Sequence, residues 1–373
     1  MFYYSLTYND SEVLGDAYEY LLSILGSQGE LGQFRTPRHI IDFMVDIVHP
    51  TKNDRILDPA CGTAGFLISA YKFIINQKEN STLNYDEKKK ILSNICGYDI
   101  EPSMVRIAEM NMYLHGCTEP DINEYDTLTF DEKWGDKYDV ILANPPFFTP
   151  KGGITPHNKF SITSKKAEVL FSEYIMEHLS REGRGAFIVP EGIIANNQSA
   201  YIELRKLMLQ TGLYAVVGLH SYVFKPYSGV STLILFFDKK YRNNSTLYLK
   251  MIENDGFEKG EGRLPISLND LPDCKSDIEM FRQYLNGMMP LSSILFAYLA
   301  FRRNDKTDTK KDARSEGVLI SDVGYIKSSI DRIEKTLDKL QEKYDDLHSR
   351  VVKIEQKVHD HVKNEQIHIT KGE

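Results

Sequence analysis

The chain has 373 residues, enough for one large domain with appendages or for two domains. Its hydrophobic fraction of 42% and charged fraction of 26% are typical of a globular protein, and its net charge of −8 argues against nucleic-acid binding through bulk electrostatics. The longest apolar run, residues 291–301, is about half the ~20 residues that cross a bilayer, and residues 1–10 do not resemble a signal peptide. The cysteines show neither close pairing nor metal-ligand spacing, which indicates a reducing cytosol and no metal site.

Strand and helix signals alternate along the first 240 residues. The expected strands span residues 55–60, 94–100, 138–147, 185–190, 213–219 and 231–237, the last two as a closing pair. The expected helices span residues 65–75 and 102–114, and the polar residues 76–90 are typical of a surface insertion. This alternation predicts an α/β protein with a mostly parallel sheet and helices on both faces.

Three polar segments stand at the carboxyl ends of expected strands: DPACG at 58–62, YDI at 98–100 and NPPF at 144–147. Ligands of such sheets bind beyond the carboxyl ends of the strands, where the strand order reverses. We therefore expect these three segments to converge on one site.

The first segment places Gly62 and Gly65 between a strand and a helix, where glycine permits close approach of a ligand to the backbone. A plain strand-to-helix turn would also accept glycines. The segment is neither the full dinucleotide fingerprint nor a P-loop. Asp99 ends the next strand, where an acidic side chain typically binds ribose hydroxyls, although it is also placed to cap the helix that starts at Pro102. A nucleoside cofactor without phosphates fits this pattern better than NAD.

The segment ILANPPFF, residues 141–148, ends a buried strand in a stiff elbow. Proline has a fixed φ and no N–H, and it pushes the preceding residue toward an extended conformation. The elbow therefore presents the amide of Asn144 and the ring of Phe147 in a fixed arrangement.

Together these segments resemble the adenine-N6 DNA methyltransferases, and specifically the modification subunit of type I restriction–modification systems. The resemblance covers about residues 12–272. Its markers are VLGDAYEYLL, GQFRTPR, DPACGTAGFLISA, GYDIEPSMVRIAEMN, YDTL, NPPF, GRGAFIVPEGII and NDGFEKGEGRLPISLNDLPD. NPPF alone is shared with other amino-group methyltransferases, whereas DPACGTAGFLISA with GQFRTPR upstream is more specific.

The resemblance implies a Rossmann-like, S-adenosylmethionine-dependent methyltransferase fold and a role for each residue of the elbow. The amide oxygen of Asn144 and the carbonyl of Pro145 would accept the two hydrogens of the adenine amine. Pro146 would stiffen the loop. Phe147 would stack on an adenine flipped out of the duplex, with ordinary core packing as the alternative.

The resemblance also assigns cofactor-binding residues. In QFRTPR these are Gln33, Thr36, Pro37 and Arg38, although Thr36 and Pro37 would equally suit the cap and first position of a helix. In the glycine loop and beyond they are Asp58, Gly62, Thr63, Ala64, Gly65, Asp99 on the ribose, and Asp126 near the cofactor's adenine, with a turn aspartate as the alternative for Asp126. Arg35 departs from the aromatic or aliphatic residue usual at its position.

The chain departs from the family pattern at both ends. The match begins near residue 12, so we expect the helical domain that normally precedes the catalytic domain to be absent. We expect a catalytic domain at 1–272, a helical extension at 273–301, a charged linker at 302–317 and a coiled-coil helix at 318–373. A run of a/d positions over about five heptads supports the coiled coil: Val323, Ile326, Ile330, Ile333, Leu337, Leu340, Tyr344, Leu347, Val351, Ile354 and Val358. An amphipathic helix packed on its own domain is the alternative.

No segment reads as a domain that recognises DNA sequence. The resemblance therefore implies DNA binding through a complex with a specificity subunit, with a restriction subunit and self-association through the coiled coil as further partners. Two other functions stay open. One is methylation of a protein glutamine or an rRNA guanine, which the upstream GQFRTPR disfavours. The other is an inactive assembly protein, which the intact NPPF disfavours.

Overall fold

The computed structural model describes residues 14–15, 17–18, 21–22, 35–77, 80, 82–244, 246–260 and 262–287. All of them belong to the first of two compact units, Met1–Tyr298. Gln33, the apolar run at 291–301, the charged linker and the predicted coiled coil lie outside the described residues. Within the described ranges, no helix is long and apolar enough to cross a membrane.

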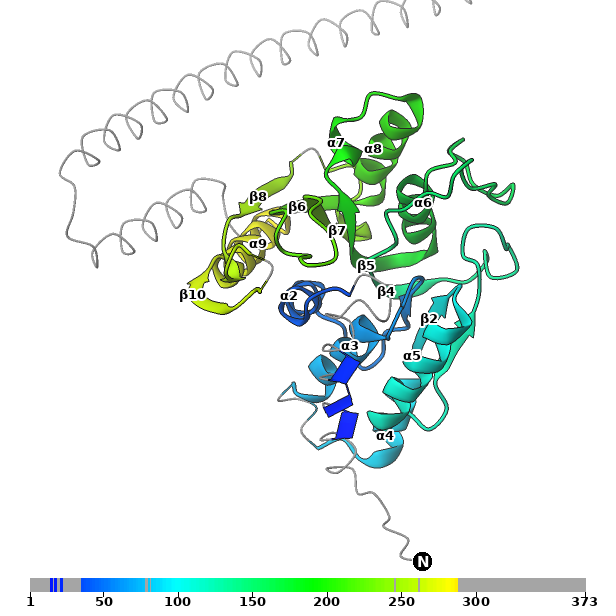
Figure 1. Ribbon diagram of the computed structural model, residues 1–373, viewed down its shortest axis with the longest axis vertical. Coiled ribbons are helices and arrows are strands. Elements are labelled where there is room, and N and C mark those ends of the chain that lie inside the picture. The colour runs from blue at the N-terminus through cyan, green and yellow to red at the C-terminus, as the bar shows by residue number, and fades with distance from the viewer. Residues whose placement is uncertain are drawn as a thin grey trace, which may run out of the picture. The chain divides into compact units, whose positions relative to one another are not determined.

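An eight-stranded, mostly parallel sheet forms the centre of the fold (Figure 1). Its strands, in spatial order, are β3 (Asp121–Glu124), β2 (Ile95–Asp99), β1 (Ile56–Asp58), β4 (Tyr138–Ala143), β5 (Leu179–Pro190), β7 (Thr232–Asp238), β6 (Leu213–Leu219) and β8 (Tyr248–Ile252). Only β7 runs antiparallel to both of its neighbours. The strand order reverses at β1, which pairs in parallel with β2 on one side and β4 on the other. This is the position at which an α/β sheet opens a crevice for a ligand.

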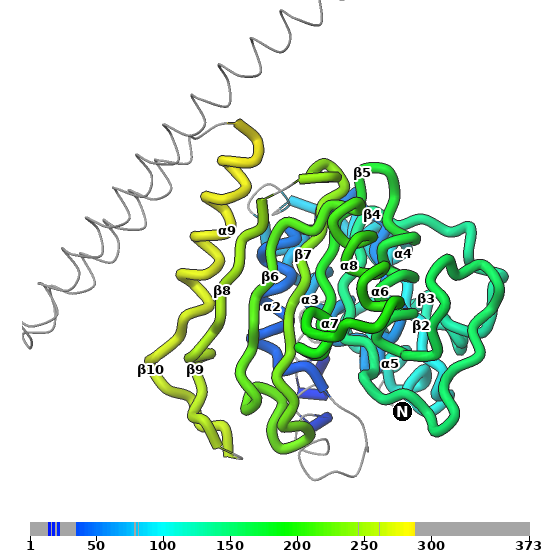
Figure 2. Tube along the Cα trace, turned by 90° about the horizontal axis from the view of Figure 1, so that it is seen from above, coloured from blue at the N-terminus to red at the C-terminus, as the bar shows by residue number. Residues whose placement is uncertain are grey.

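Helices cover both faces of the sheet (Figure 2). One layer contains α2 (Arg38–Val48), α3 (Gly65–Ile75), α4 (Tyr85–Ser93), α5 (Pro102–Leu114) and α9 (Leu271–Leu285). The other contains α6 (Ala167–His178), α7 (Gly192–Ala195) and α8 (Ser199–Thr211). A short hairpin of β9 (Asp255–Phe257) and β10 (Pro265–Asn269) follows β8, and the 3-10 helix η2 (Lys239–Tyr241) follows β7.

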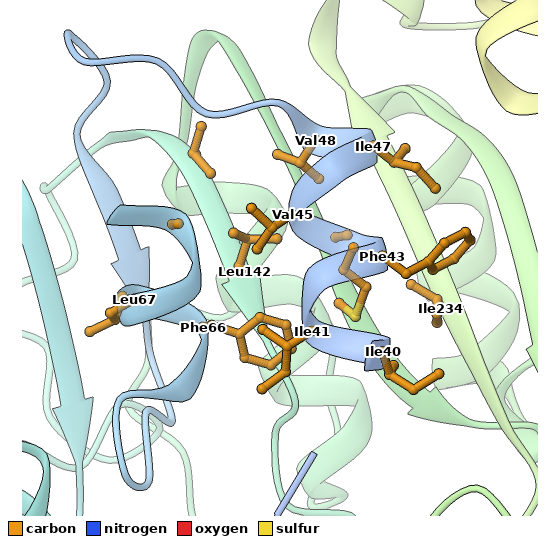
Figure 3. Close-up of a cluster of buried hydrophobic side chains, with 14 of the residues drawn as sticks. Ile40, Ile41, Phe43, Val45, Ile47, Val48, Phe66, Leu67, Leu142 and Ile234 are labelled. Atoms are coloured by element: carbon orange, nitrogen blue, oxygen red, sulfur yellow. The ribbon is translucent and has the colours of Figure 1, made fainter. Parts of the chain in front are cut away.

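The side chains of β4 show how the two layers are divided. Val140 and Leu142 point into the cluster beneath α2 and α3, whereas Ile141 and Ala143 point into the cluster beneath α6 and α8. Figure 3 shows Leu142 among the apolar side chains of α2 and α3. The centre of the sheet is therefore buried on both faces, so a ligand meets its central strands at their ends.

The predicted α/β class and mostly parallel sheet are confirmed, and helices α3 and α5 have the predicted bounds. The bounds of β1, β2 and β7 differ from the predicted ones by one or two residues, and two further bounds differ by more. Strand β4 ends at Ala143 rather than 147, because the two prolines cannot continue it, and β5 begins six residues before the predicted 185. The expected surface insertion ends in helix α4, which begins with a capping box between Asn84 and Glu87. The predicted boundary at residue 272 falls inside α9 and stays a prediction.

Candidate functional site

A cavity of about 640 Å³ opens at the carboxyl ends of β1, β2 and β4. Its wall contains Gly62 after β1, Asp99 at the end of β2 and Asn144 after β4, so the predicted convergence of these three strand ends is confirmed. The other predicted residues in the wall are Asp126, Pro145, Pro146 and Phe147. Its volume lies in the range of natural small-molecule sites.

The loop between β1 and α3 is held by its backbone. The Cys61 N–H donates to the Tyr98 carbonyl (2.8 Å), and the Asn111 amide donates to the Thr63 carbonyl (2.8 Å). Gly62 has φ +53°, and a side chain added there would meet no atom within 4 Å. The glycine therefore supplies a left-handed turn and leaves open space beside the cavity. Ala64 adopts the same left-handed region at φ +64° and is fully buried.

Asp99 connects this loop to the next strand. Its carboxylate accepts a hydrogen bond from the Gly62 N–H (2.9 Å) and one from the Glu101 N–H (2.9 Å). Glu101 is the N-cap residue of α5, so the alternative that Asp99 itself caps this helix is wrong. Burial raises the pKa of Asp99. The carboxylate is thus oriented at the cavity wall by two backbone donors.

Asp58 supports the loop from behind and is not part of the cavity wall. Its side chain is 1% exposed and accepts a hydrogen bond from the Ala60 N–H (3.1 Å). Burial raises its pKa to about 8; the charge of Asp99 adds to this shift, and the Ala60 bond opposes it. Thr63, Ala64 and Gly65 also lie outside the wall. Gly65 allows α3 to approach α2, because a Cβ there would lie 3.1 Å from the Ile41 side chain.

We expect Asp58 to make the stability of the chain fall as the pH rises. In the folded chain the Asp58 carboxyl stays protonated up to about pH 8. In the unfolded chain it has the ordinary pKa of 3.8 and loses its proton at a much lower pH. Between these values, stability should fall by about 1.4 kcal/mol per pH unit relative to Asp58→Asn, which cannot ionise. Urea unfolding of both proteins from pH 5 to pH 9 measures the difference. Parallel curves would show that Asp58 titrates normally.

The Asn144 side chain has one hydrogen-bond partner among the described residues, the Thr36 hydroxyl. The amide N–H₂ donates to the Thr36 hydroxyl (2.9 Å), while the amide oxygen is buried and accepts no hydrogen bond from the described residues. A buried carbonyl oxygen without a donor costs free energy, so it marks a position where a ligand N–H would fit. Pro145 is buried and Pro146 exposed, so the elbow is anchored on one side only.

The segment before α2 differs from the helix start suggested by its sequence. The N-cap residue is Pro37 and the helix begins at Arg38, so Thr36 is not the cap and Pro37 is not the first helical residue. The Thr36 hydroxyl instead accepts from Asn144, which lies 108 positions away. Arg38 donates to the Gly65 carbonyl (3.3 Å) and thereby connects α2 to the first turn of α3. Neither Pro37 nor Arg38 lies in the cavity wall.

Asp126 and Phe147 both lie in the cavity wall, and each also makes the structural contacts weighed as its alternative. Asp126 lies in the wall, and its carboxylate also accepts from the N–H groups of Leu128 (3.0 Å) and Thr129 (3.2 Å), as a turn aspartate does. Phe147 lies in the wall and packs, partly buried, against the larger core cluster. Phe148 beside it is 74% exposed.

The segment between β6 and β7 also contributes to the cavity, which was not predicted from the sequence. Phe224 and Ser228 of this segment lie in the cavity wall. The segment begins at His220, whose ring faces the buried carboxylate of Asp255 (3.4 Å). That carboxylate also accepts from His39 of α2 (3.0 Å) and binds Arg263. No local pattern in the sequence indicates that these distant residues meet.

The Asp255 carboxylate is charged and fully buried. Burial raises its pKa, but the hydrogen bonds from His39 and Arg263 and the charge of Arg263 outweigh this and hold the pKa well below its usual range. Breaking such a buried pair is strongly destabilising. The network therefore connects the start of α2 to the segment that carries Phe224 and Ser228.

Residues 9–270 match the family of N-6 DNA methylases. The methylase subunit of the type I restriction enzyme EcoEI from Escherichia coli is 31% identical over 265 residues, which are 70% of this chain and 53% of that protein. Among solved structures, a chain of a type I restriction–modification system, studied for complex assembly and conformational transition, superposes with a TM-score of 0.66 and 26% identity. That match covers 90% of this chain and 73% of the other.

The M protein of the type I restriction enzyme EcoKI superposes with a TM-score of 0.51 and 27% identity over 57% of this chain and 46% of that one. The chain spans about half the length of the EcoEI subunit. The match to the methylase family, in contrast, covers well over half of this chain. The chain thus belongs to the N-6 DNA methylase family.

Proposed function

We propose that this chain transfers a methyl group from S-adenosylmethionine to the N6 amine of an adenine flipped out of DNA, as the modification subunit of a type I restriction–modification assembly. The observation that carries the proposal is the Asn144 amide. Its nitrogen donates to the Thr36 hydroxyl, and its buried oxygen, at the cavity wall, accepts no hydrogen bond from the described residues. An adenine amine would supply an N–H donor to this oxygen.

The chemistry depends on two fixed acceptors. The lone pair of an adenine amine is delocalised into the ring, so the amine is a poor nucleophile. The Asn144 oxygen and the Pro145 carbonyl would accept hydrogen bonds from its two N–H groups. These bonds would draw the nitrogen toward tetrahedral geometry and direct its lone pair at the methyl donor. Positioning and electrostatic preorganisation of this kind need no separate strong base. Phe147 would stack on the flipped ring.

The methyl donor, S-adenosylmethionine, supplies an activated methyl group on a sulfonium. Asp99 would accept from its ribose hydroxyls, because its carboxylate is already fixed by Gly62 and Glu101. Asp126, which lies in the wall, would accept a hydrogen bond from the adenine amine of the cofactor. The open space at Gly62 would admit the cofactor close to the backbone. Thr36, Pro37 and Arg38, together with Gln33, would lie around its methionine end.

The choice of DNA sequence would come from a separate specificity subunit, with a restriction subunit as a further partner. Relatives named as subunits of type I restriction enzymes support this proposal. The predicted heptads at 323–358 would provide the helix for this assembly or for self-association. As such a modification subunit, the chain would act in the cytoplasm.

Transfer of tritiated methyl groups tests the proposal directly. The chain is incubated with labelled S-adenosylmethionine and DNA, with and without a co-expressed specificity subunit, and the product base is identified after digestion. We expect label in N6-methyladenine, strongest with the specificity subunit. Parallel reactions on ribosomes and on a glutamine-bearing protein substrate act as controls. Label only in those controls, or cofactor binding without transfer to DNA in either setting, would refute the proposal.

A further inference from the structure

The segment between β4 and α6 is locally basic in an acidic chain. Residues 145–166 contain four lysines, Lys151, Lys159, Lys165 and Lys166, and no aspartate or glutamate. All four lysine side chains are exposed. The chain as a whole carries a net charge of −8. A positive surface of this kind attracts anions locally, even where the overall charge repels them.

The segment has two arms, one on each side of Lys159, and the arms meet at the rim of the cavity. The Ile154 N–H donates to the Lys165 carbonyl (3.0 Å), and the Ala167 N–H donates to the Thr149 hydroxyl (3.1 Å). A Cβ added to Gly153 would lie 2.7 Å from the Cβ of Lys165, so the arms are in direct contact.

The lysines lie next to the cavity in the chain as well. Pro150 and Gly153, on either side of Lys151, are in the cavity wall, and so is Ala167, which follows Lys166 directly. Lys151, Lys165 and Lys166 therefore border the cavity that contains Asn144. We call these three residues the rim lysines.

The rim lysines have no acidic partner in the part of the chain that the structure describes. Lys159, in contrast, pairs with Asp131 (3.1 Å). The nearby Glu168 is directed elsewhere, because its carboxylate accepts from the Tyr201 hydroxyl of α8 (2.6 Å). Lys165 and Lys166 also stand at the N-terminal end of α6, where the helix dipole disfavours positive charge. An anion beside them would offset both unfavourable features.

We propose that the rim lysines bind the phosphates of DNA that flank the adenine entering the cavity. The proposal rests on the proposed function, since that function makes DNA the substrate. It explains how an acidic chain could hold a polyanion at one place, at the mouth of its cavity. Phosphate contacts of this kind fix the position of the DNA without reading its sequence. Sequence choice can therefore remain with a partner.

The test compares two matched pairs of adjacent lysines. In the first variant Lys165 and Lys166 are both changed to Gln. In the control Lys89 and Lys90 of α4 are both changed to Gln, which removes the same charge from exposed positions that are not in the cavity wall. Each full-length protein is assembled with the specificity subunit. Binding of a fluorescent duplex is titrated at several salt concentrations, and methyl transfer is measured on the same duplex.

Loss of two phosphate contacts should reduce the slope of log affinity against log salt by about two. We expect the Lys165/Lys166 variant to bind DNA about tenfold or more weakly near 0.1 M salt, with KM for DNA raised and kcat at saturating DNA unchanged. Affinity for S-adenosylmethionine should not change. The Lys89/Lys90 variant should match the wild type in every measurement, and changing Lys165 and Lys166 to Arg should retain the wild-type slope.

This design distinguishes failure of the inference about the rim lysines from failure of the proposed function. If the Lys165/Lys166 variant binds DNA with the same affinity and salt slope as the Lys89/Lys90 variant, the rim lysines do not contact phosphate and the inference is wrong. If the wild type binds DNA but transfers no methyl group to it, the proposed function fails, while the binding data still decide the role of the rim lysines.

Discussion

Replacing Asn144 by Ala should lower methyl transfer to DNA by about two to three orders of magnitude, the scale seen when one preorganised polar contact to a reacting group is removed. The substitution deletes the buried oxygen that would accept from the adenine amine and leaves the cavity open. Affinity for S-adenosylmethionine should stay within about a factor of two, because Asp99 and Gly62 are untouched. Single-turnover transfer of tritiated methyl groups, with calorimetry for the cofactor, measures both.

Thr36→Val supplies the control for orientation. It keeps the shape of the Thr36 side chain but removes the hydroxyl that accepts from the Asn144 amide (2.9 Å). The amide can then rotate, and we expect a smaller loss of activity, about tenfold, the effect of about one hydrogen bond. If Asn144→Ala methylates DNA at the wild-type rate, the elbow is only structural and the proposed mechanism is wrong.

Local signals predicted those parts of the fold that depend on near neighbours. The bounds of α3 and α5 followed from their apolar spacing and, for α5, from the proline at its first position. Strand β3 was missed because DINE, with one buried side chain, carries no strand pattern of its own and is stabilised by pairing with β2. Strand β8 was missed because its exposed positions hold Leu249 and Met251, so YLKMI shows no alternation of apolar and polar residues.

The candidate site divides in the same way. Gly62, Asp99 and Asn144 were predicted together because a parallel sheet brings the carboxyl ends of its strands to one edge. The resemblance assigned Thr36 to the cofactor site, whereas in the structure its hydroxyl accepts a hydrogen bond from the Asn144 amide. Phe224, Ser228 and the buried Asp255 network depend on contacts between residues far apart in the chain, for which one sequence holds no local signal. Asp255 lies within a segment that carried the resemblance, but its partners could not be inferred.

The Asp99 carboxylate should dominate cofactor affinity. Charge-assisted hydrogen bonds to ribose hydroxyls contribute about 1.5–3 kcal/mol each, so Asp99→Ala should weaken binding of S-adenosylmethionine at least about tenfold in calorimetry. Glu124→Ala is a suitable control. Glu124 lies opposite Asp99 on the neighbouring strand β3, is exposed, and is not in the cavity wall. Thermal unfolding of both variants would separate a lost ligand contact from a loosened glycine loop.

The pH dependence of binding should then assign the effect to the charge of Asp99. Burial raises the pKa of this carboxyl, and the ribose hydroxyls donate to its ionised form. Lowering the pH protonates it, so wild-type affinity for S-adenosylmethionine should fall on the acidic side. Asp99→Asn keeps the shape and cannot ionise, so its affinity should be lower than that of the wild type at neutral pH and should lack this acidic fall. An Asn variant that follows the wild-type curve, or Ala and Glu124 variants of equal affinity, would remove Asp99 from the cofactor site.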